Sequence, residues 1–233
     1  MMVSVSQRSA RCKEEIKTII YQDRRILAAE KPCGVLSTDE PGGMPELLRQ
    51  ELHEPHGCVL TVHRLDRAVS GLMVFARSHR AAALLSEQIR SGVFQKEYLA
   101  VVRGCPAQPE GTLTDHLIRD RERRTTRIAD ESDPQAQEAR LHYAVLDEHA
   151  GYALLRIRLL TGRTHQIRVQ FSGRGMPLLG DRKYGCGEDC PIGLWSWSLS
   201  FLHPQTGEAM TLRRLPPQAA PWTPFSDALA RLP

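Results

Sequence analysis

The sequence predicts an α+β domain built on a mixed, mainly antiparallel central sheet with flanking helices. Short apolar runs bounded by turn residues outnumber the segments with helical periodicity, which favours a sheet-dominated fold. Most connections between the runs are too short for the crossovers that parallel strands need, so antiparallel neighbours are expected. The 233 residues show no internal repeat and no clean linker, which indicates a single catalytic-sized domain over residues 16–233. Residues 1–15 are polar and are expected to form a flexible tail.

The first part of the chain predicts a hairpin followed by a short helix. Two apolar runs, residues 18–21 and 26–29, are separated by a polar stretch and have the pattern of paired strands. Pro32 is expected to end the second strand, because proline has no N–H to donate to a ladder. A short helix is expected at residues 45–52, where Pro45 suits the first helical position.

The middle of the chain predicts further strands, a longer helix and an exposed insert. Residues 59–62, 72–76 and 96–102 are expected to form strands. Ser78 can cap a helix that runs to about residue 91, and its buried stripe is expected to contain Leu84, Leu85 and Ile89. Residues 106–138 are rich in Arg and Asp and are expected to form an exposed hairpin or flap.

The last part of the chain continues to alternate strands with short helices. Paired strands are expected at residues 141–146 and 152–160, followed by a short helix at residues 164–172. In that helix Ile167 and Phe171 lie four residues apart and should face the core, whereas Arg168 should lie on the opposite stripe. Two further strands are expected at residues 194–201 and 208–213, and a short final helix is expected in the proline-rich tail.

Composition and charge are typical of a soluble globular protein. Hydrophobic residues make up 41% of the chain and charged residues 25%, and the net charge of +4 permits an anionic partner without demanding one. No apolar run approaches the ~20 residues that a membrane span needs. The first residues also lack the apolar core of a signal peptide. We therefore expect a cytoplasmic protein without a membrane partner. A monomer is also expected, although no pattern in the sequence specifies the oligomeric state.

The six cysteines are scattered along a chain too large to be a disulfide scaffold, so reduced thiols are expected. Cys186 and Cys190, with His203 downstream, raise the alternative of a metal-dependent hydrolase. No second ligand pair follows at the spacing of a zinc finger. Two loop cysteines without a metal are therefore the simpler interpretation.

Unlike polar groups concentrate at the ends of apolar runs in three segments, residues 63–70, 96–98 and 162–168. In the first segment Asp66 lies beside Arg64 and Arg67, and His63 precedes it by three residues. A carboxylate beside arginines stays charged at neutral pH, which suits a nucleophile or a base rather than a proton donor. A solvated hairpin loop whose charges pair on the surface is the alternative explanation.

Several common chemistries lack their sequence signatures. A glycosidase of the usual kind needs a second carboxyl group as its acid, and no such group accompanies Asp66. Ser70 and Ser172 lack the nucleophile-elbow pattern of serine hydrolases. The chain also contains neither a phosphate-binding Gly-rich loop nor a dinucleotide fingerprint.

Four blocks of the sequence resemble the RluA-type pseudouridine synthases. They are residues 63–72, 96–104, 160–168 and 177–185, and Lys31-Pro32-Cys33-Gly34 and residues 201–207 also fit. The resemblance spans about residues 16–215 in the family's order and implies that family's catalytic fold. It implies that a uridine in ribosomal or transfer RNA is isomerised: the base is detached from C1′ of its ribose, turned and rejoined through C5. No metal and no organic cofactor is implied.

The resemblance also assigns roles to individual residues. Asp66 matches the catalytic aspartate, which attacks the sugar or the base or helps to remove a proton. Tyr98 matches the tyrosine that stacks on the target base and serves in proton removal, and Arg168 matches the arginine that pairs with the aspartate. Arg64 matches the residue that helps to fill the gap left by the flipped nucleotide. His63 and Leu194 complete the expected substrate-binding set, with Leu194 as an apolar wall beside the uracil.

The chain departs from the family pattern in three ways. Val69 stands where the family usually has Thr, and Trp195 stands where it often has His. The chain begins too close to its first strand to hold the S4-like RNA-binding domain of many relatives, so target selection is expected to depend on the catalytic domain and its basic insert. The insert carries arginines that suit phosphate contacts, namely Arg119, Arg121, Arg123, Arg124 and Arg127.

A catalytically inactive RNA-binding protein of the same fold is the alternative function. Retention of Asp66, Tyr98 and Arg168 argues against it, because a protein that only binds RNA has no need of that combination.

Overall fold

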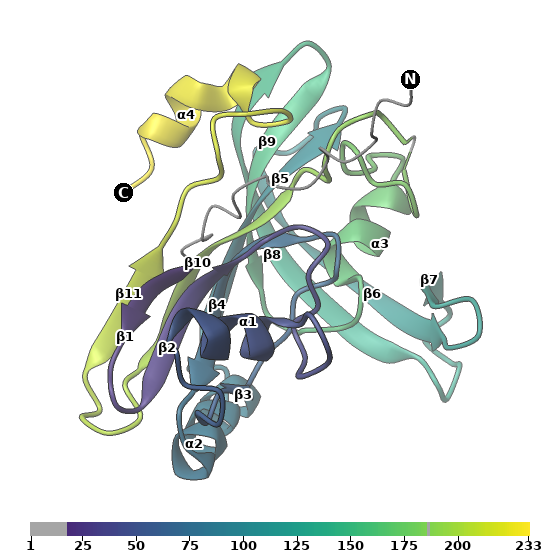
Figure 1. Ribbon diagram of the computed structural model, residues 1–233. Coiled ribbons are helices and arrows are strands. Elements are labelled where there is room, and N and C mark those ends of the chain that lie inside the picture. The colour runs from purple at the N-terminus through teal and green to yellow at the C-terminus, as the bar shows by residue number, and fades with distance from the viewer. Residues whose placement is uncertain (1–17, 186) are drawn as a thin grey trace, which may run out of the picture.

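The structure of the protein is a computed structural model that describes residues 18–185 and 187–233 (Figure 1). The tail expected at residues 1–15 and Cys186 therefore lie outside the described residues. The strands are β1 (Ile19–Gln22), β2 (Ile26–Lys31), β3 (Leu60–Thr61), β4 (Ser70–Ala76), β5 (Gln95–Arg103), β6 (Glu110–Asp120), β7 (Thr125–Ala129), β8 (Gln137–His149), β9 (Tyr152–Leu159), β10 (Leu194–Leu202) and β11 (Ala209–Arg213). The helices are α1 (Met44–Glu51), α2 (His79–Arg90), α3 (Gln166–Ser172), the 3₁₀ turn η1 (Thr223–Phe225) and α4 (Ser226–Ala230).

The described strands form one mixed sheet, as the sequence predicted. Their order is β1-β2-β4-β10-β5-β9-β8-β6-β7, with β11 added to β10 and β3 added to β4 (Figure 1). The β4–β10 pair is parallel, and the other pairs of named strands are antiparallel. The chain crosses from β4 to β10 through more than a hundred residues of intervening structure, so this neighbour pair is a long-range contact.

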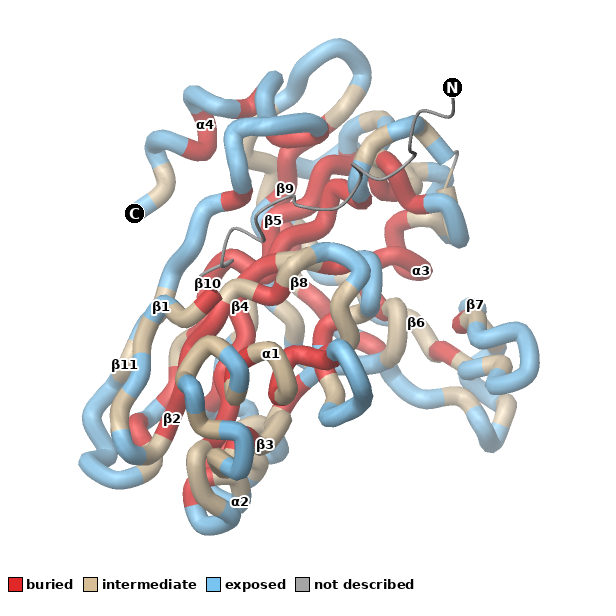
Figure 2. Tube along the Cα trace, viewed as in Figure 1, coloured by how far each residue is buried: buried red, intermediate tan, exposed pale blue. Residues whose placement is uncertain are grey.

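Side chains of the central strands alternate between two faces, and both faces are covered. On β4, Met73 and Phe75 face a core that also contains side chains of α1 and α3. Leu72 and Val74 face the opposite way, into a core shared with α2. Figure 2 shows this buried layer running along the central strands. On β5, Tyr98 shares the first face with Ala100 and Val102.

Gly71 allows β4 and β10 to approach each other closely beside the Asp66 loop. Its φ of +114° lies in the left-handed half of the backbone map, and a Cβ there would lie 2.4 Å from Ser196 O. A larger residue would therefore push β10 away, and β10 carries the Leu194 side chain. The glycine in the first sequence block is thus explained by backbone packing.

Helix α2 begins where the sequence predicts, since the Ser78 hydroxyl accepts a hydrogen bond from Ala81 N at 3.2 Å. The expected buried stripe is wrong in one member: Leu84 is 40% exposed. The buried line is formed by Ala81 and Leu85, with Ile89 partly buried against the same core. Residues four apart lie nearly above one another on a helix, whereas Leu84 is rotated by about 100° from Leu85.

The arginine-rich insert is confirmed as a hairpin, and it is continuous with the sheet. Strand β6 pairs with β8 from Glu110 to Leu117 and with β7 from His116 to Asp120. Leu117 is buried with Ala139 and with Val169 of α3, so β6 is anchored to the domain beneath the hairpin turn. The arginines of residues 119–127 are all exposed. In Figure 1 the β6–β7 hairpin extends from the edge of the sheet near α3.

Each helix of residues 18–185 and 187–233 falls short of the length and apolar character that a membrane crossing requires.

Candidate active site

A cleft of about 970 Å³ brings together the three polar segments that the sequence places far apart. It is bounded by the loop before β4, by β5, by the turn leading into α3 and by the start of β10. All the residues that sequence reasoning placed in the site line this cleft: His63, Arg64, Asp66, Tyr98, Arg168 and Leu194. The alternative of a hairpin loop whose charges simply pair on the surface does not describe this arrangement.

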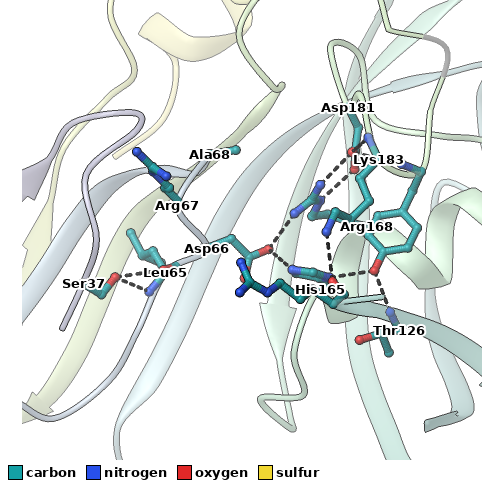
Figure 3. A network of polar contacts seen from close by, with 12 residues as sticks. Ser37, Leu65, Asp66, Arg67, Ala68, Thr126, His165, Arg168, Asp181 and Lys183 are labelled. Atoms are coloured by element: carbon teal, nitrogen blue, oxygen red, sulfur yellow. Dashed lines mark hydrogen bonds and ion pairs between the residues drawn. The ribbon is translucent and has the colours of Figure 1, made fainter. Parts of the chain in front are cut away.

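The loop that carries Asp66 is anchored on both sides by buried polar groups. Ser37 Oγ donates to Leu65 O at 2.8 Å and accepts from Leu65 N at 3.0 Å (Figure 3). Lys31 is fully buried, and its Nζ donates to the carbonyl groups of Pro32, Val35 and Arg67. Burial lowers the pKa of Lys31 to about 8. These contacts fix the backbone immediately before and after Asp66.

Arg168 joins two carboxylates through different nitrogens. Its Nε and one terminal nitrogen donate to Asp181 at 2.7 Å each, a bidentate pair buried from solvent. Its other terminal nitrogen donates to Asp66 Oδ2 at 3.0 Å (Figure 3). The Asp66 side chain remains 24% exposed, whereas Asp181 is completely enclosed. Asp181 therefore fixes the guanidinium, and the guanidinium in turn orients Asp66 at the cleft surface.

Asp181 is itself held by backbone groups of the loop between α3 and β10. Burial acts to raise the pKa of Asp181, but the Arg168 guanidinium and the backbone N–H groups of Lys183 and Tyr184 hold it below its usual value. The Arg168 guanidinium also lies 5.1 Å from the centre of the Tyr184 ring, over its face. Sequence reasoning placed Asp181 in a matched block but gave it no role, because its partner lies thirteen residues away on a helix.

Tyr98 presents a largely buried aromatic ring to the cleft. It lies on β5 with 6% of its surface exposed. Burial, together with the negative charge of Asp66, raises the pKa of the Tyr98 hydroxyl, so the group is a neutral phenol at neutral pH. A neutral ring at the base of a cleft is suited to stacking against a planar group.

His63 is a buried, neutral imidazole whose nitrogens do not face solvent. Its Nε2 accepts a hydrogen bond from Val74 N at 3.0 Å, and its Nδ1 is enclosed without a partner in the described chain. The ring packs against Phe94, with centroids 5.4 Å apart. Burial, and secondarily the charge of Lys96, lowers the pKa of His63 to about 3. These contacts connect the start of the Asp66 loop to β4.

We predict that His63 makes the protein less stable in mild acid. The unfolded imidazole binds a proton at an ordinary pKa of 6.5 and the folded one only at about 3, so stability is lost as the pH falls from 6.5 toward 3. In this window His63 lowers the free energy of unfolding by up to about 1.4 kcal/mol for each pH unit of acidification. Urea unfolding at several pH values should show a shallower acid loss in His63→Gln, which keeps an acceptor for Val74 N. Equal acid losses in both proteins would contradict this explanation.

Leu194 and Trp195 point to opposite sides of β10, which explains one departure from the family pattern. Leu194 lines the cleft and belongs to the core that contains Tyr98. Trp195 belongs to the core on the other face, and its Nε1 donates to Arg214 O at 2.7 Å. Val69 is buried beside the cleft as an apolar core residue. Trp195 therefore lies outside the cleft. Arg64 lines the cleft and is exposed at the surface of the protein.

Sequence reasoning missed His165 and Lys96 as cleft residues. His165 Nε2 lies 3.8 Å from Asp66 Oδ2 (Figure 3), and Lys96 is a partly buried cation whose pKa burial lowers. Both residues lie inside blocks that were quoted for the family resemblance. No spacing rule distinguished them from neighbouring polar residues, since their partners come from other elements of the fold.

The metal-site alternative receives no support from the described residues. Within residues 18–185 and 187–233, no group of three or more His, Cys, Asp and Glu side chains is placed to hold a metal ion. His203 Nε2 instead lies 2.9 Å from Asp23 Oδ2, and His203 Nδ1 accepts from Thr206 N at 3.2 Å. Cys186 lies outside the described residues.

A comparison with protein families identifies the chain's relatives. The sequence model of the RNA pseudouridylate synthase family matches residues 25–173, which include Asp66, Tyr98 and Arg168. The chain belongs to this family. It is 34% identical over 198 residues to the dual-specificity RNA pseudouridine synthase RluA of Vibrio vulnificus, covering 81% of this chain and 78% of that protein. It is 33% identical to the ribosomal large subunit pseudouridine synthase C of Escherichia coli O157:H7, covering 91% of this chain and 68% of that protein.

The pseudouridine synthase fold is also recovered from structure alone. Human RNA pseudouridylate synthase domain containing 1 superposes with a TM-score of 0.73 over 93% of this chain and 95% of its own, at 22% identity. Human RNA pseudouridylate synthase domain containing 4 superposes with a TM-score of 0.74 over 91% of this chain and 93% of its own, at 21% identity. The protein is thus an RNA pseudouridine synthase, an isomerase, with the fold that the resemblance implied.

Proposed function

We propose that this pseudouridine synthase isomerises specific uridines in ribosomal or transfer RNA, with Asp66 as its catalytic carboxylate. The observation that carries the proposal is the Asp66–Arg168 pair, which lies at 3.0 Å in the same cleft as the Tyr98 ring. The name of one relative, a ribosomal large subunit pseudouridine synthase, favours ribosomal RNA, and the name of another, a dual-specificity RNA pseudouridine synthase, favours more than one kind of target.

The proposed chemistry requires that the target nucleotide leave its helix. A stacked base cannot reach a cleft on the protein, and flipping it out costs a few kcal/mol. Stacking on Tyr98 would return ~1–3 kcal/mol. Arg64 is exposed at the cleft surface, and in this proposal it fills the gap in the RNA, while the buried Leu194 serves as an apolar wall for the uracil.

The two oxygens of Asp66 differ in their surroundings, and this favours one of them as the reacting atom. Oδ2 accepts from Arg168 and lies 3.8 Å from His165 Nε2. Oδ1 has no hydrogen bond from the described part of the chain and belongs to a partly exposed side chain. We therefore assign the reaction with the nucleoside to Oδ1, while Oδ2 holds the carboxylate in place. In the overall reaction the bond from C1′ to N1 is replaced by one from C1′ to C5, and C5 loses its proton as N1 gains one.

The β6–β7 hairpin is proposed to hold the RNA backbone beside the cleft. Arg119 and Arg121 are exposed and line the cleft, and neither pairs with a carboxylate of the described residues. Unpaired guanidinium groups at the edge of an active-site cleft suit phosphate groups flanking the flipped nucleotide.

Replacing Arg119 and Arg121 together with alanine is expected to weaken RNA binding and to reduce its salt dependence. Each lost phosphate contact lowers the slope of log affinity against log salt by about 0.7–0.9. Filter binding at several salt concentrations measures both effects. Arg156→Ala/Arg158→Ala is a control that removes the same charge. Both arginines are exposed on β9 and alternate with the core residues Leu155 and Ile157, so they lie on the other face of the strand. An unchanged slope in the hairpin variant, or an equal change in the control, would remove the hairpin from the RNA interface.

Mapping pseudouridines in cells with and without the gene tests the proposed substrate. The expected result is the loss of one or more pseudouridines from ribosomal or transfer RNA, restored by the wild-type chain. Losses confined to other RNAs would overturn the substrate assignment. We also propose that the enzyme acts in the cytoplasm, together with these RNAs, and as a monomer.

A further inference from the structure

His165 is held in an unusual backbone conformation beside the catalytic carboxylate. It stands immediately before α3 with a φ of +55°, in the left-handed region that most residues other than glycine avoid. Its own side chain makes no capping hydrogen bond to the helix. Strained residues of this kind are retained where the surrounding contacts define them, and they are frequent at active sites. The contacts of the His165 imidazole therefore indicate the role of this left-handed backbone conformation.

A chain of polar contacts connects the His165 ring to the arginine-rich hairpin. His165 Nδ1 lies 2.6 Å from the Tyr184 hydroxyl oxygen, and that oxygen accepts a hydrogen bond from Thr126 N at 2.7 Å. Thr126 is a buried residue of β7, in the same hairpin as Arg119 and Arg121. Lys183 Nζ also donates to Arg124 O at 2.9 Å, so the 177–185 loop contacts the hairpin at two points.

These contacts determine where the imidazole carries its proton. The Tyr184 hydroxyl accepts from Thr126 N, so the phenol proton is free to be donated to His165 Nδ1. The opposite tautomer would leave that phenol proton without a partner at this site, which is costly for a partly buried group. With Nδ1 as the acceptor, a neutral ring carries its proton on Nε2. Nε2 is the nitrogen that lies 3.8 Å from Asp66 Oδ2.

The charges around His165 favour its neutral form. Burial lowers the pKa of His165, and the cations Arg168, Lys183 and Arg119 lower it further, whereas Asp66 acts in the opposite direction. Burial also raises the pKa of the Tyr184 hydroxyl, which keeps the donated proton on the phenol. Figure 3 shows the imidazole between Asp66 and the Thr126 segment.

We propose that His165 is a positioning residue for Asp66: Tyr184 fixes it as the Nε2–H tautomer, and its Nε2–H supports Asp66 Oδ2 alongside Arg168. The 3.8 Å separation closes to a hydrogen bond when RNA occupies the cleft, as catalytic hydrogen bonds often tighten in the bound complex. Tyr184 is hydrogen-bonded to Thr126 of β7. RNA that docks on the β6–β7 hairpin therefore affects the contact between His165 and Asp66. The inference rests on the proposed role of Asp66.

The protonation state can be measured without any assay of activity. ¹⁵N NMR of the histidine rings in the full-length protein distinguishes a protonated Nε2 from a protonated Nδ1. We expect His165 to be a neutral Nε2–H tautomer at neutral pH and to lose this preference in Tyr184→Phe, which keeps the ring under Arg168 but removes the hydroxyl. A protonated Nδ1 in the wild-type protein would overturn the proposal, whether or not the RNA substrate is known.

Two substitutions at His165 separate positioning from folding. In His165→Gln the amide nitrogen occupies the place of Nε2 and keeps a donor toward Asp66. In His165→Asn the amide corresponds to Nδ1, so the contact with Tyr184 is kept and the donor toward Asp66 is lost. Asparagine also tolerates the left-handed backbone. Thermal unfolding of both variants shows whether the fold is retained.

The kinetic expectations follow from this difference. The assays are single-turnover and steady-state measurements on RNA that the wild-type enzyme modifies. We expect the kcat of His165→Asn to fall on the order of 10²-fold, which is the scale for a misplaced catalytic group. The KM of His165→Asn should remain nearly unchanged. His165→Gln should regain most of the wild-type kcat. Wild-type kcat in His165→Asn, or equally low kcat in a folded His165→Gln, would overturn the proposal. A wild-type enzyme inactive on ribosomal and transfer RNA would instead contradict the proposed substrate.

Discussion

Replacing Asp66 with asparagine is expected to lower the rate of pseudouridine formation by about 10⁴-fold or more, while RNA binding and folding persist. The amide has nearly the same shape as the carboxylate but carries no negative charge, so Oδ1 loses its reactivity toward the nucleoside. Folding should persist because Arg168 keeps its buried bidentate pair with Asp181. RNA binding should persist because the phosphate contacts proposed for the hairpin do not involve Asp66.

Release of tritium from RNA labelled at C5 of uridine measures this loss, because the proton leaves C5 in each turnover. Filter binding and thermal unfolding of the same variant give its affinity and stability. Asp39→Asn is a matched control, since Asp39 also pairs with an arginine, Arg49, and its side chain does not line the cleft. The control should retain wild-type activity. Turnover of Asp66→Asn within tenfold of wild type would exclude Asp66 as the catalytic group.

Replacing Asp181 with alanine is expected to destabilise the protein by about 3–5 kcal/mol, the usual cost of leaving one member of a buried ion pair without its partner. Asp181 is completely enclosed and accepts two hydrogen bonds from Arg168 as well as those from the backbone N–H groups of Lys183 and Tyr184. The same change frees the guanidinium that orients Asp66, so activity should fall as well.

Chemical denaturation at neutral pH measures the loss of stability in Asp181→Ala. The pKa of folded Asp181 lies below its ordinary value of 3.8, so the contribution of the pair is present above that pH and is lost as the pH falls below it. Glu87→Ala serves as a control, because Glu87 pairs with Arg90 on the exposed side of α2 and its loss should change stability little. A loss below about 1 kcal/mol in Asp181→Ala would show that the buried pair does not hold the site together.

Local patterns in the sequence were sufficient for most of the secondary structure, and the blocks that match the family supplied the catalytic candidates. The apolar runs around residues 26–29 and 96–102, the cap at Ser78 and the ends marked by Gly and Pro are short-range signals, and the strands and helices follow them closely. The exposed position of Leu84 shows the limit of such signals. Neighbouring apolar residues on a helix cannot all face one core, and only the packed partner selects which of them is buried.

The network around Asp66 could not be predicted in the same way. Arg168 was expected to pair with Asp66, but the buried carboxylate that fixes it, Asp181, resembles any other acidic loop residue in the sequence. The role of His165 depends on Tyr184, which contacts it, and on Thr126, which contacts Tyr184. These two residues lie 19 and 39 positions away from His165 along the chain. They come together only because β7 and the 177–185 loop pack against α3. Contacts between such distant segments leave no periodic pattern in the sequence from which they could be predicted.

The sequence by itself determined the class of the fold and the family, and it supplied the residues that we propose for the chemistry, because each of these depends on residue types within short blocks. The tertiary structure decided how those blocks meet: the parallel pairing of β4 with β10, the cleft of about 970 Å³, and the bracing of Asp66 by Arg168 and Asp181. Both the β4–β10 pairing and the Asp66–Arg168 contact join segments more than a hundred residues apart. Whether a buried charge is paired is a property of the packed chain, since neither partner is enclosed until the sheet and α3 have come together.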